Sequence, residues 1–283
     1  MPALDDVRVT CIATNIPGPV TAARLRDLGA HVTKIEPPSG DPLAYACPAW
    51  YAEMTRGMRV VTLDLKDPEQ RVQLGEYLAA ADLLLTSSRP AALENLRLDW
   101  GTLHAAYPKL CHVAIVGHLA PEENRAGHDL TYVAAHGLVA PPRLPPTLIA
   151  DLAGAERAAL AGLALLHARD RGCGSGQCLV ALADAAEAFA APLRHRVTTP
   201  QGLLGGGLPN YNLYKTKDGW LAVAALETHF LERLKRELSL ARAEHEDLQA
   251  VFATRTAAEW QAWAAARDLP IAAVQAAPPA GIS

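Results

Sequence analysis

The fold is decided by residues 7–35, VRVTCIATNIPGPVTAARLRDLGAHVTKI, near the start of the 283-residue chain. Residues 7–14 form an apolar, β-rich run, and residues 15–19 form a loop. An amphipathic helical pattern follows and stops at Gly29, and residues 31–35 are typical of a second strand. Strand, helix and strand in this order predict a βαβ unit with parallel strands and a right-handed crossover. The loop lacks the GxGxxG fingerprint, which argues against a nicotinamide-dependent oxidoreductase.

The same alternation continues through about the first 120 residues. Strand patterns cover residues 59–65, 81–86 and 110–116, and helical patterns begin near residues 68 and 90. We therefore predict a doubly wound α/β domain, whose ligands bind beyond the carboxyl ends of its strands. Arg89 follows one such strand, and its guanidinium suits a phosphate or carboxylate ligand. A solvated surface arginine is the more common alternative.

Residues 127–154, GHDLTYVAAHGLVAPPRLPPTLIADLAG, place two ionisable residues at the heads of two helix-like segments. His128 begins a helical pattern that ends at Gly137, before a proline-rich loop. Asp151 stands where we expect the N-cap of a long Ala/Leu-rich helix over residues 152–169. We interpret this stretch as the active site. The alternative is that Asp151 only caps its helix and that His128 only makes a local hydrogen bond.

The sequence pattern in the second half of the chain indicates a domain boundary followed by a smaller domain. Residues 178–182 form a strand that returns to the sheet, and residues 193–209 lose periodicity and include three consecutive glycines at 205–207. We predict a large domain over residues 1–195 and a small domain over residues 205–283. The small domain begins with a hairpin of residues 211–215 and 220–226 and continues with helical patterns around 230–238, 246–252 and 257–266.

Composition excludes several classes of protein. The net charge is only −4, without a basic run, so we expect no nucleic-acid partner. No apolar run reaches about 18 residues, and the N-terminus lacks a secretory signal, so we predict a cytoplasmic protein without a membrane segment. The five cysteines lack CxxC spacing and no HExxH occurs, so we expect no metal site. A GxSxG elbow is also absent, which argues against a serine hydrolase.

Several blocks resemble the family III CoA-transferases of the CaiB/BaiF type, which include α-methylacyl-CoA racemase, formyl-CoA transferase and carnitine CoA-transferase. They are PGPVTAARLRDLGAHVTKIEPPSGDP, RGMRVVTLDLKDP, SRPAALENLRLDW, GHDLTY, ADLAGA, GSGQCLVALADA, YNLYKTKDGWLAVAALETHF and FATRTAAEW, spread over nearly the whole chain. The resemblance implies a large Rossmann-like domain with a parallel sheet, a smaller α+β domain and an interlocked homodimer.

The resemblance also implies site residues. In the racemase branch the catalytic groups fall on His128, Asp151 and Glu227, and coenzyme A (CoA) enters as part of the substrate, with no tightly bound cofactor. The implied contacts with CoA are Pro17, Gly18, Lys34, Arg56 and Arg89. Two features depart from the family pattern: arginines are missing at Pro37 and after Asp41, and only 56 residues follow Glu227, so we expect an abbreviated C-terminal segment.

Two chemistries are compatible with these residues. Racemisation of an acyl-CoA needs one group to remove the α-proton and another to return a proton, and a neutral histidine and a protonated carboxylic acid suffice. We therefore predict α-proton transfer on a 2-methylacyl-CoA-type thioester, with His128 and the coupled carboxylates Asp151 and Glu227. The alternative is a CoA-transferase in which Asp151 is the nucleophile and residues 205–207 are either a mobile cover or a linker. A second alternative is a CoA-binding protein without catalysis.

Overall fold

The computed structural model describes residues 2–277, which fall into two compact units that divide between Ala190 and Ala191. The first unit contains a six-stranded parallel sheet, and the second contains a three-stranded antiparallel sheet. The predicted class, a Rossmann-like α/β domain with a smaller α+β domain, is confirmed. Within residues 2–277, no helix combines the length and the apolar composition that crossing a membrane requires.

The parallel sheet has the doubly wound strand order β3-β2-β1-β4-β5-β6. Its strands are β1 (Arg8–Cys11), β2 (His31–Glu36), β3 (Arg59–Thr62), β4 (Leu83–Thr86), β5 (Cys111–Val116) and β6 (Gln177–Ala181). The winding direction reverses between β1 and β4, which are hydrogen-bonded neighbours. The connections that leave these two strands turn to opposite faces of the sheet, so a crevice opens at their carboxyl ends.

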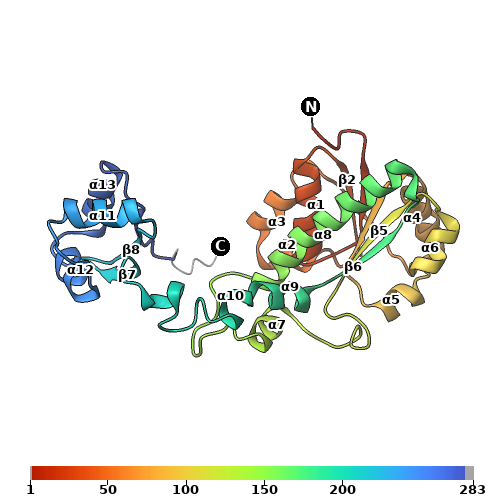
Figure 1. The fold of residues 1–283 in the computed structure, drawn as a ribbon. Coiled ribbons are helices and arrows are strands. Elements are labelled where there is room, and N and C mark those ends of the chain that lie inside the picture. Colours follow the sequence, from red (N-terminus) through yellow and green to blue (C-terminus); the bar gives the residue numbers. More distant parts are fainter. Residues whose placement is uncertain (1, 278–283) are drawn as a thin grey trace. The chain divides into compact units, whose positions relative to one another are not determined.

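Helices cover both faces of this sheet (Figure 1). One face packs against α1 (Pro17–Asp27), α7 (Asp129–Ala135), α8 (Ile149–Ala168) and α9 (Leu182–Phe189), and the other packs against α4 (Pro68–Ala80), α5 (Pro90–Asn95) and α6 (Trp100–Ala106). Strand β4 shows why both faces are apolar. Leu83 and Leu85 belong to the first layer and Leu84 to the second, because successive side chains of a strand alternate between faces.

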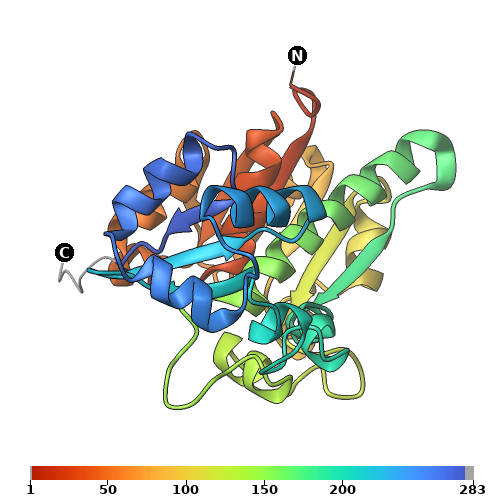
Figure 2. The ribbon, with the colours of Figure 1, turned by 60° about the vertical axis from the view of Figure 1, so that its left-hand side comes forward.

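Helix α8 lies against α1 and the sheet, and it turns back at residues 169–176 into β6 (Figure 2). Its glycines permit this close packing. A Cβ atom on Gly154 would come within 2.3 Å of Leu182 Cδ2, and one on Gly162 within 2.9 Å of Leu83 Cδ2. The N-terminus of α8 is thereby held near the carboxyl ends of the strands. The remaining helices of this unit are α2 (Pro42–Ala46) and α3 (Pro48–Thr55).

The second unit begins with the short helix α10 (Ala191–Arg194) and the turn Leu203–Gly207. Its sheet contains the predicted hairpin, β7 (Tyr211–Lys215) with β8 (Trp220–Ala224), which is confirmed, and the unpredicted strand β9 (Ile271–Ala273). Helices α11 (Thr228–Glu237), α12 (His245–Phe252) and α13 (Ala257–Ala265) complete the unit. Tyr214, Phe252 and Trp260 form the aromatic centre of its core, with ring centroids 5.2 Å apart between successive rings.

Candidate active site

A cavity of about 400 Å³ lies in the first unit, at the carboxyl ends of the parallel strands. Its lining residues come from the segments that follow β1, β4, β5 and β6, together with α7 and α8. They include Asn15, Arg89, Glu123, His128, Tyr132 and Asp151. The cavity therefore occupies the crevice that the reversal of strand order creates, which is where doubly wound sheets bind ligands.

Asp151 is placed differently from the sequence-based prediction. Helix α8 begins at Ile149, with Leu148 at its N-cap position, so Asp151 lies in the first turn and the predicted N-cap role is wrong. The backbone N–H of Asp151 donates a hydrogen bond to Asp129 Oδ1 at 3.0 Å. A carboxylate from α7 thus takes over part of the capping that the sequence assigned to Asp151 itself. The side chain of Asp151 remains on the wall of the cavity.

The surroundings of Asp151 hold a proton near neutral pH. Burial and, to a smaller extent, the negative charge of Asp129 raise the pKa of its carboxyl to about 6, although His128 opposes the shift. Burial also raises the pKa of Tyr132, with a smaller contribution from Asp151, while Arg89 lowers it. A carboxyl group that titrates near the working pH can both accept and donate a proton, which general acid–base catalysis requires.

His128 occupies the N-cap position of α7, and its backbone groups are satisfied locally. Its N–H donates to Thr131 Oγ1 at 3.0 Å, and the Thr131 hydroxyl donates to the His128 carbonyl at 2.7 Å. These bonds fix the backbone of the helix start while the imidazole lines the same cavity as Asp151. The structure therefore brings together the two residues that the sequence proposed across the proline-rich loop.

The expected CoA contacts are distributed unevenly. Pro17 and Arg89 line the cavity. Gly18 is buried where α1 approaches the end of β1, and a Cβ atom there would lie 2.1 Å from the Cβ of Ala13. Arg56 is an exposed residue after α3 and is not among the residues that line the cavity. Only part of this set is therefore available to a ligand in the cavity.

Lys34 is fully buried, and its ammonium donates to Glu36 Oε1 at 2.5 Å and to Asp41 Oδ2 at 2.8 Å. The Tyr51 hydroxyl also donates a hydrogen bond to Glu36 Oε1, at 2.6 Å. A direct contact between Lys34 and CoA would require this group of four residues, which we call the Lys34 cluster, to open. The cluster instead supports the cavity wall, because Asp41 Oδ1 accepts a hydrogen bond from the backbone N–H of Asn15 at 3.2 Å.

The third proposed catalytic residue, Glu227, lies in the second unit. It is exposed and occupies the N-cap position of α11. Sequence reasoning did not single out Asp129 or Glu123. Asp129 follows His128 directly in the chain, but its hydrogen bond with the backbone of α8 cannot be inferred from the sequence. Glu123 lies in an irregular segment between β5 and α7, where no periodic pattern indicates the direction of a side chain.

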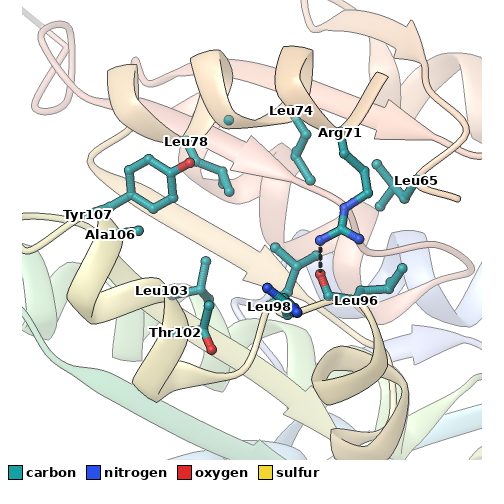
Figure 3. A pocket seen from close by; sticks show the side chains of 12 residues that line it. Leu65, Arg71, Leu74, Leu78, Leu96, Leu98, Thr102, Leu103, Ala106 and Tyr107 are labelled. Carbon is teal, nitrogen blue, oxygen red and sulfur yellow. Dashed lines mark hydrogen bonds between the residues drawn. The ribbon is translucent and has the colours of Figure 1, made fainter. Parts of the chain in front are cut away.

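A second cavity of the first unit, of about 210 Å³, lies between α4, α6 and the segment that joins α5 to α6 (Figure 3). Leucines make up half of its lining residues, and the Arg71 guanidinium donates a hydrogen bond to the Leu96 carbonyl at 3.0 Å. Its lining residues include no carboxylate, histidine or cysteine. This cavity therefore lacks the ionisable carboxylate and imidazole of the first one, and the cavity of Asp151 and His128 is the candidate active site.

The fold is a doubly wound sheet with His128 and Asp151 on the wall of its switch-point crevice, and comparison with known proteins shows the family. The family model "CoA-transferase family III" matches residues 4–280. The α-methylacyl-CoA racemase of Homo sapiens is 29% identical, over 91% of this chain and 74% of that protein. Succinyl-CoA–D-citramalate CoA-transferase of Chloroflexus aurantiacus is 31% identical, over 83% of this chain and 64% of that protein.

Solved structures agree with this comparison. The crystal structure of Rv3272 from Mycobacterium tuberculosis matches 98% of this chain and 85% of that chain, with a TM-score of 0.81 and 26% identity. The chain therefore belongs to CoA-transferase family III, and the resemblance noted from the sequence blocks is confirmed. It spans slightly less than two thirds of the length of the Chloroflexus relative.

Proposed function

We propose that the protein is an acyl-CoA-dependent enzyme that transfers the α-proton of a 2-methylacyl-CoA-type thioester, as a racemase or epimerase does. The observation that carries this proposal is the shared cavity of His128 and Asp151, in which the carboxyl pKa is raised to about 6. The likeness to α-methylacyl-CoA racemase over 91% of the chain supports it. CoA enters as part of the substrate, without a tightly bound cofactor.

In this proposal one group of the pair removes the α-proton and the other returns a proton to the opposite face of the carbon. A neutral imidazole at His128 is a suitable base near neutral pH, and the protonated carboxyl of Asp151 is a suitable donor. The reverse reaction exchanges these roles. Negative charge then develops on the thioester oxygen, and backbone N–H groups in the first turn of α8 are donors of the kind that stabilise it.

Glu227 is the third proposed catalytic group, because it matches the glutamate of the racemase motif. Its carboxylate is exposed at the head of α11, in the second unit, and a homodimer is the other part of this proposal that the resemblance implies. Replacing Glu227 by Gln should then lower the rate of exchange without changing the affinity of the first unit for CoA. Sedimentation equilibrium of the full chain tests the homodimer, and a monomer at all concentrations contradicts it.

Deuterium exchange tests the reaction directly. In deuterated water the enzyme should incorporate deuterium at the α-carbon of 2-methylpropanoyl-CoA, as followed by mass spectrometry. Asp151→Asn and His128→Ala should each slow incorporation by about 10²–10⁴-fold, because each removes one of the two proton-transfer groups.

The matched control is Glu156→Gln, an exposed carboxylate on the same helix that pairs with Arg24. It should exchange at the wild-type rate. Absence of incorporation with every 2-methylacyl-CoA offered to the folded wild-type protein would show that the proposed reaction is wrong.

The second candidate is transfer of CoA between carboxylic acids, with Asp151 as the nucleophile. The identity with the citramalate CoA-transferase, and 34% identity over 59% of the chain with cinnamoyl-CoA:phenyllactate CoA-transferase of Clostridium sporogenes, favour it. In this mechanism the carboxylate attacks the thioester, CoA leaves as the thiolate, and a mixed anhydride remains on the protein. Hydroxylamine should then convert Asp151 to a hydroxamate only when an acyl-CoA is present. Full transferase activity of Asp151→Asn would exclude this route.

A further inference from the structure

Glu123 presents a carboxylate oxygen that nothing in the protein satisfies. The residue lies between β5 and α7, is partly exposed and lines the cavity that contains Asp151 and His128. Its Oε2 atom is buried, and within residues 2–277 it has no hydrogen-bond partner. Buried oxygens without a partner are rare in folded proteins, because removing such an atom from water is costly.

Neither of the two arginines that line the same cavity, Arg89 and Arg125, donates a hydrogen bond to Glu123 Oε2. Arg125 pairs with Glu122, at 3.0 Å between Nη1 and Oε2. Arg89 forms no ion pair with Glu123 among the residues that the structure describes. An oxygen that is left unpaired on the wall of a ligand cavity is available to a hydrogen-bond donor that arrives with the ligand.

We propose that Glu123 is a specificity-determining residue, whose Oε2 accepts a hydrogen bond from an N–H or O–H group of the bound thioester. This inference rests on the proposed function, because it takes an acyl-CoA as the occupant of the cavity. The reacting part of the substrate does not supply this donor. The thioester oxygen is only an acceptor, and the α-C–H is not a hydrogen-bond donor of comparable strength.

An acyl-CoA offers such a donor in two kinds of place: the part that every CoA ester shares, which includes the amide N–H and hydroxyl groups of the pantetheine arm, and a hydroxyl group on the acyl chain. Both would form a charge-assisted hydrogen bond with the carboxylate, which is stronger than a bond between neutral groups. The two sources predict different selectivity. A pantetheine donor makes Glu123 a general determinant of CoA affinity, whereas an acyl hydroxyl makes it a determinant of the acyl group.

Calorimetric titration of the full-length protein with three probes separates these sources. The probes are CoA, 2-methylpropanoyl-CoA and 3-hydroxy-2-methylpropanoyl-CoA, and the variants are Glu123→Leu and Glu123→Gln. Glu123→Leu should weaken binding about tenfold or more. If the donor is on pantetheine, all three probes should bind more weakly. If the donor is on the acyl chain, only the hydroxyacyl ester should bind more weakly. Glu123→Gln, which keeps an acceptor oxygen without the charge, should show a smaller loss.

Thermal unfolding without ligand distinguishes this role from a structural one. Because Oε2 stabilises nothing within the protein, Glu123→Leu should unfold at the wild-type temperature or above it. The control Glu94→Leu removes an exposed carboxylate of α5 and should bind all three probes as the wild type does.

Two results would overturn the inference. Wild-type affinity of Glu123→Leu for all three probes would remove Glu123 from ligand binding and leave the proposed function intact. Failure of the folded wild-type protein to bind any of the probes would instead overturn the proposed function, and the role of Glu123 with it.

Discussion

Two groups of buried or half-buried carboxylates in the first unit have opposite surroundings. In the Lys34 cluster, Glu36 and Asp41 share the ammonium of Lys34, and Asp41 also accepts backbone hydrogen bonds from Asn15 and Leu43. At the cavity, burial and the charge of Asp129 raise the pKa of Asp151, and Glu123 Oε2 has no partner among the described residues. The negative charges of the Lys34 cluster are balanced by the Lys34 ammonium, whereas the carboxylates at the cavity have no comparable cation within residues 2–277.

This difference indicates a structural role for the Lys34 cluster and a chemical role for the carboxylates at the cavity. A buried charge with good partners holds backbone segments together, and here it links β2, the loop after it and the loop that contains Asn15. A buried carboxyl with too few partners retains its proton at a higher pH and can exchange it with a ligand. The group of carboxylates with fewer partners is therefore a stronger reason than the size of a cavity to choose this cavity as the candidate active site.

The largest effect on stability is expected from Lys34→Met. This change leaves two buried carboxylates without their cation, and removal of one partner from a buried ion pair typically costs about 3–5 kcal/mol. Urea unfolding of the variant should show a loss of this size in the free energy of unfolding. Lys66→Met, at an exposed lysine after β3, should stay within about 0.5 kcal/mol of the wild type. An equally small change for Lys34→Met would show that the cluster is not a structural link.

Asp129→Asn tests how much the charge of Asp129 contributes to the raised pKa of Asp151. An asparagine oxygen can still accept the hydrogen bond from the Asp151 N–H, but the negative charge that raises the pKa of Asp151 is removed. The pKa of Asp151 should therefore fall from about 6 toward the ordinary value of an aspartate. Carboxyl ¹³C NMR titration measures this shift, with Asp184→Asn as a control on α9. A constant pKa for Asp151 would mean that burial alone sets it.

The smallest effect is the contribution of Asp151 to the pH dependence of stability. Its pKa is raised from 3.8 to about 6 in the folded protein, so the folded state binds more protons than the unfolded state between these values. The contribution of Asp151 to stability is thus fully present below the lower value and is lost as the pH rises through about 6. The difference in the free energy of unfolding between wild type and Asp151→Asn should follow this decline. A difference independent of pH would contradict the raised pKa.

Much of the large sheet could be predicted because local patterns encode it. The strands β4 and β5 are continuous apolar runs, which indicate burial on both faces, and prolines mark the starts of α4 and α5. Strand β9 was missed because its three residues are too few to show a pattern. Its strand conformation depends on pairing with β8, which lies far away in the chain.

The site was predictable where a residue type and its neighbours in the chain are sufficient. His128 and Asp151 were identified from short motifs, and the parallel sheet implied a ligand crevice at its carboxyl edge. The start of α8 was misjudged, because Asp129 caps it from another helix rather than Asp151 from its own. Lys34 was proposed as a ligand contact, and its burial between Glu36 and Asp41 cannot be inferred from alternation along one strand.

The sequence by itself thus determined the fold class, the family and two residues of the candidate site. These depend on periodicity and on contiguous motifs, which the order of residues expresses directly. Only the tertiary structure decided which charges removed from water are compensated: Lys34 lies between two carboxylates, Asp151 faces the negative charge of Asp129 with His128 opposing it, and Glu123 Oε2 has no partner within residues 2–277. Compensation depends on distances between atoms of different segments and on their removal from water, and the packing of those segments sets both.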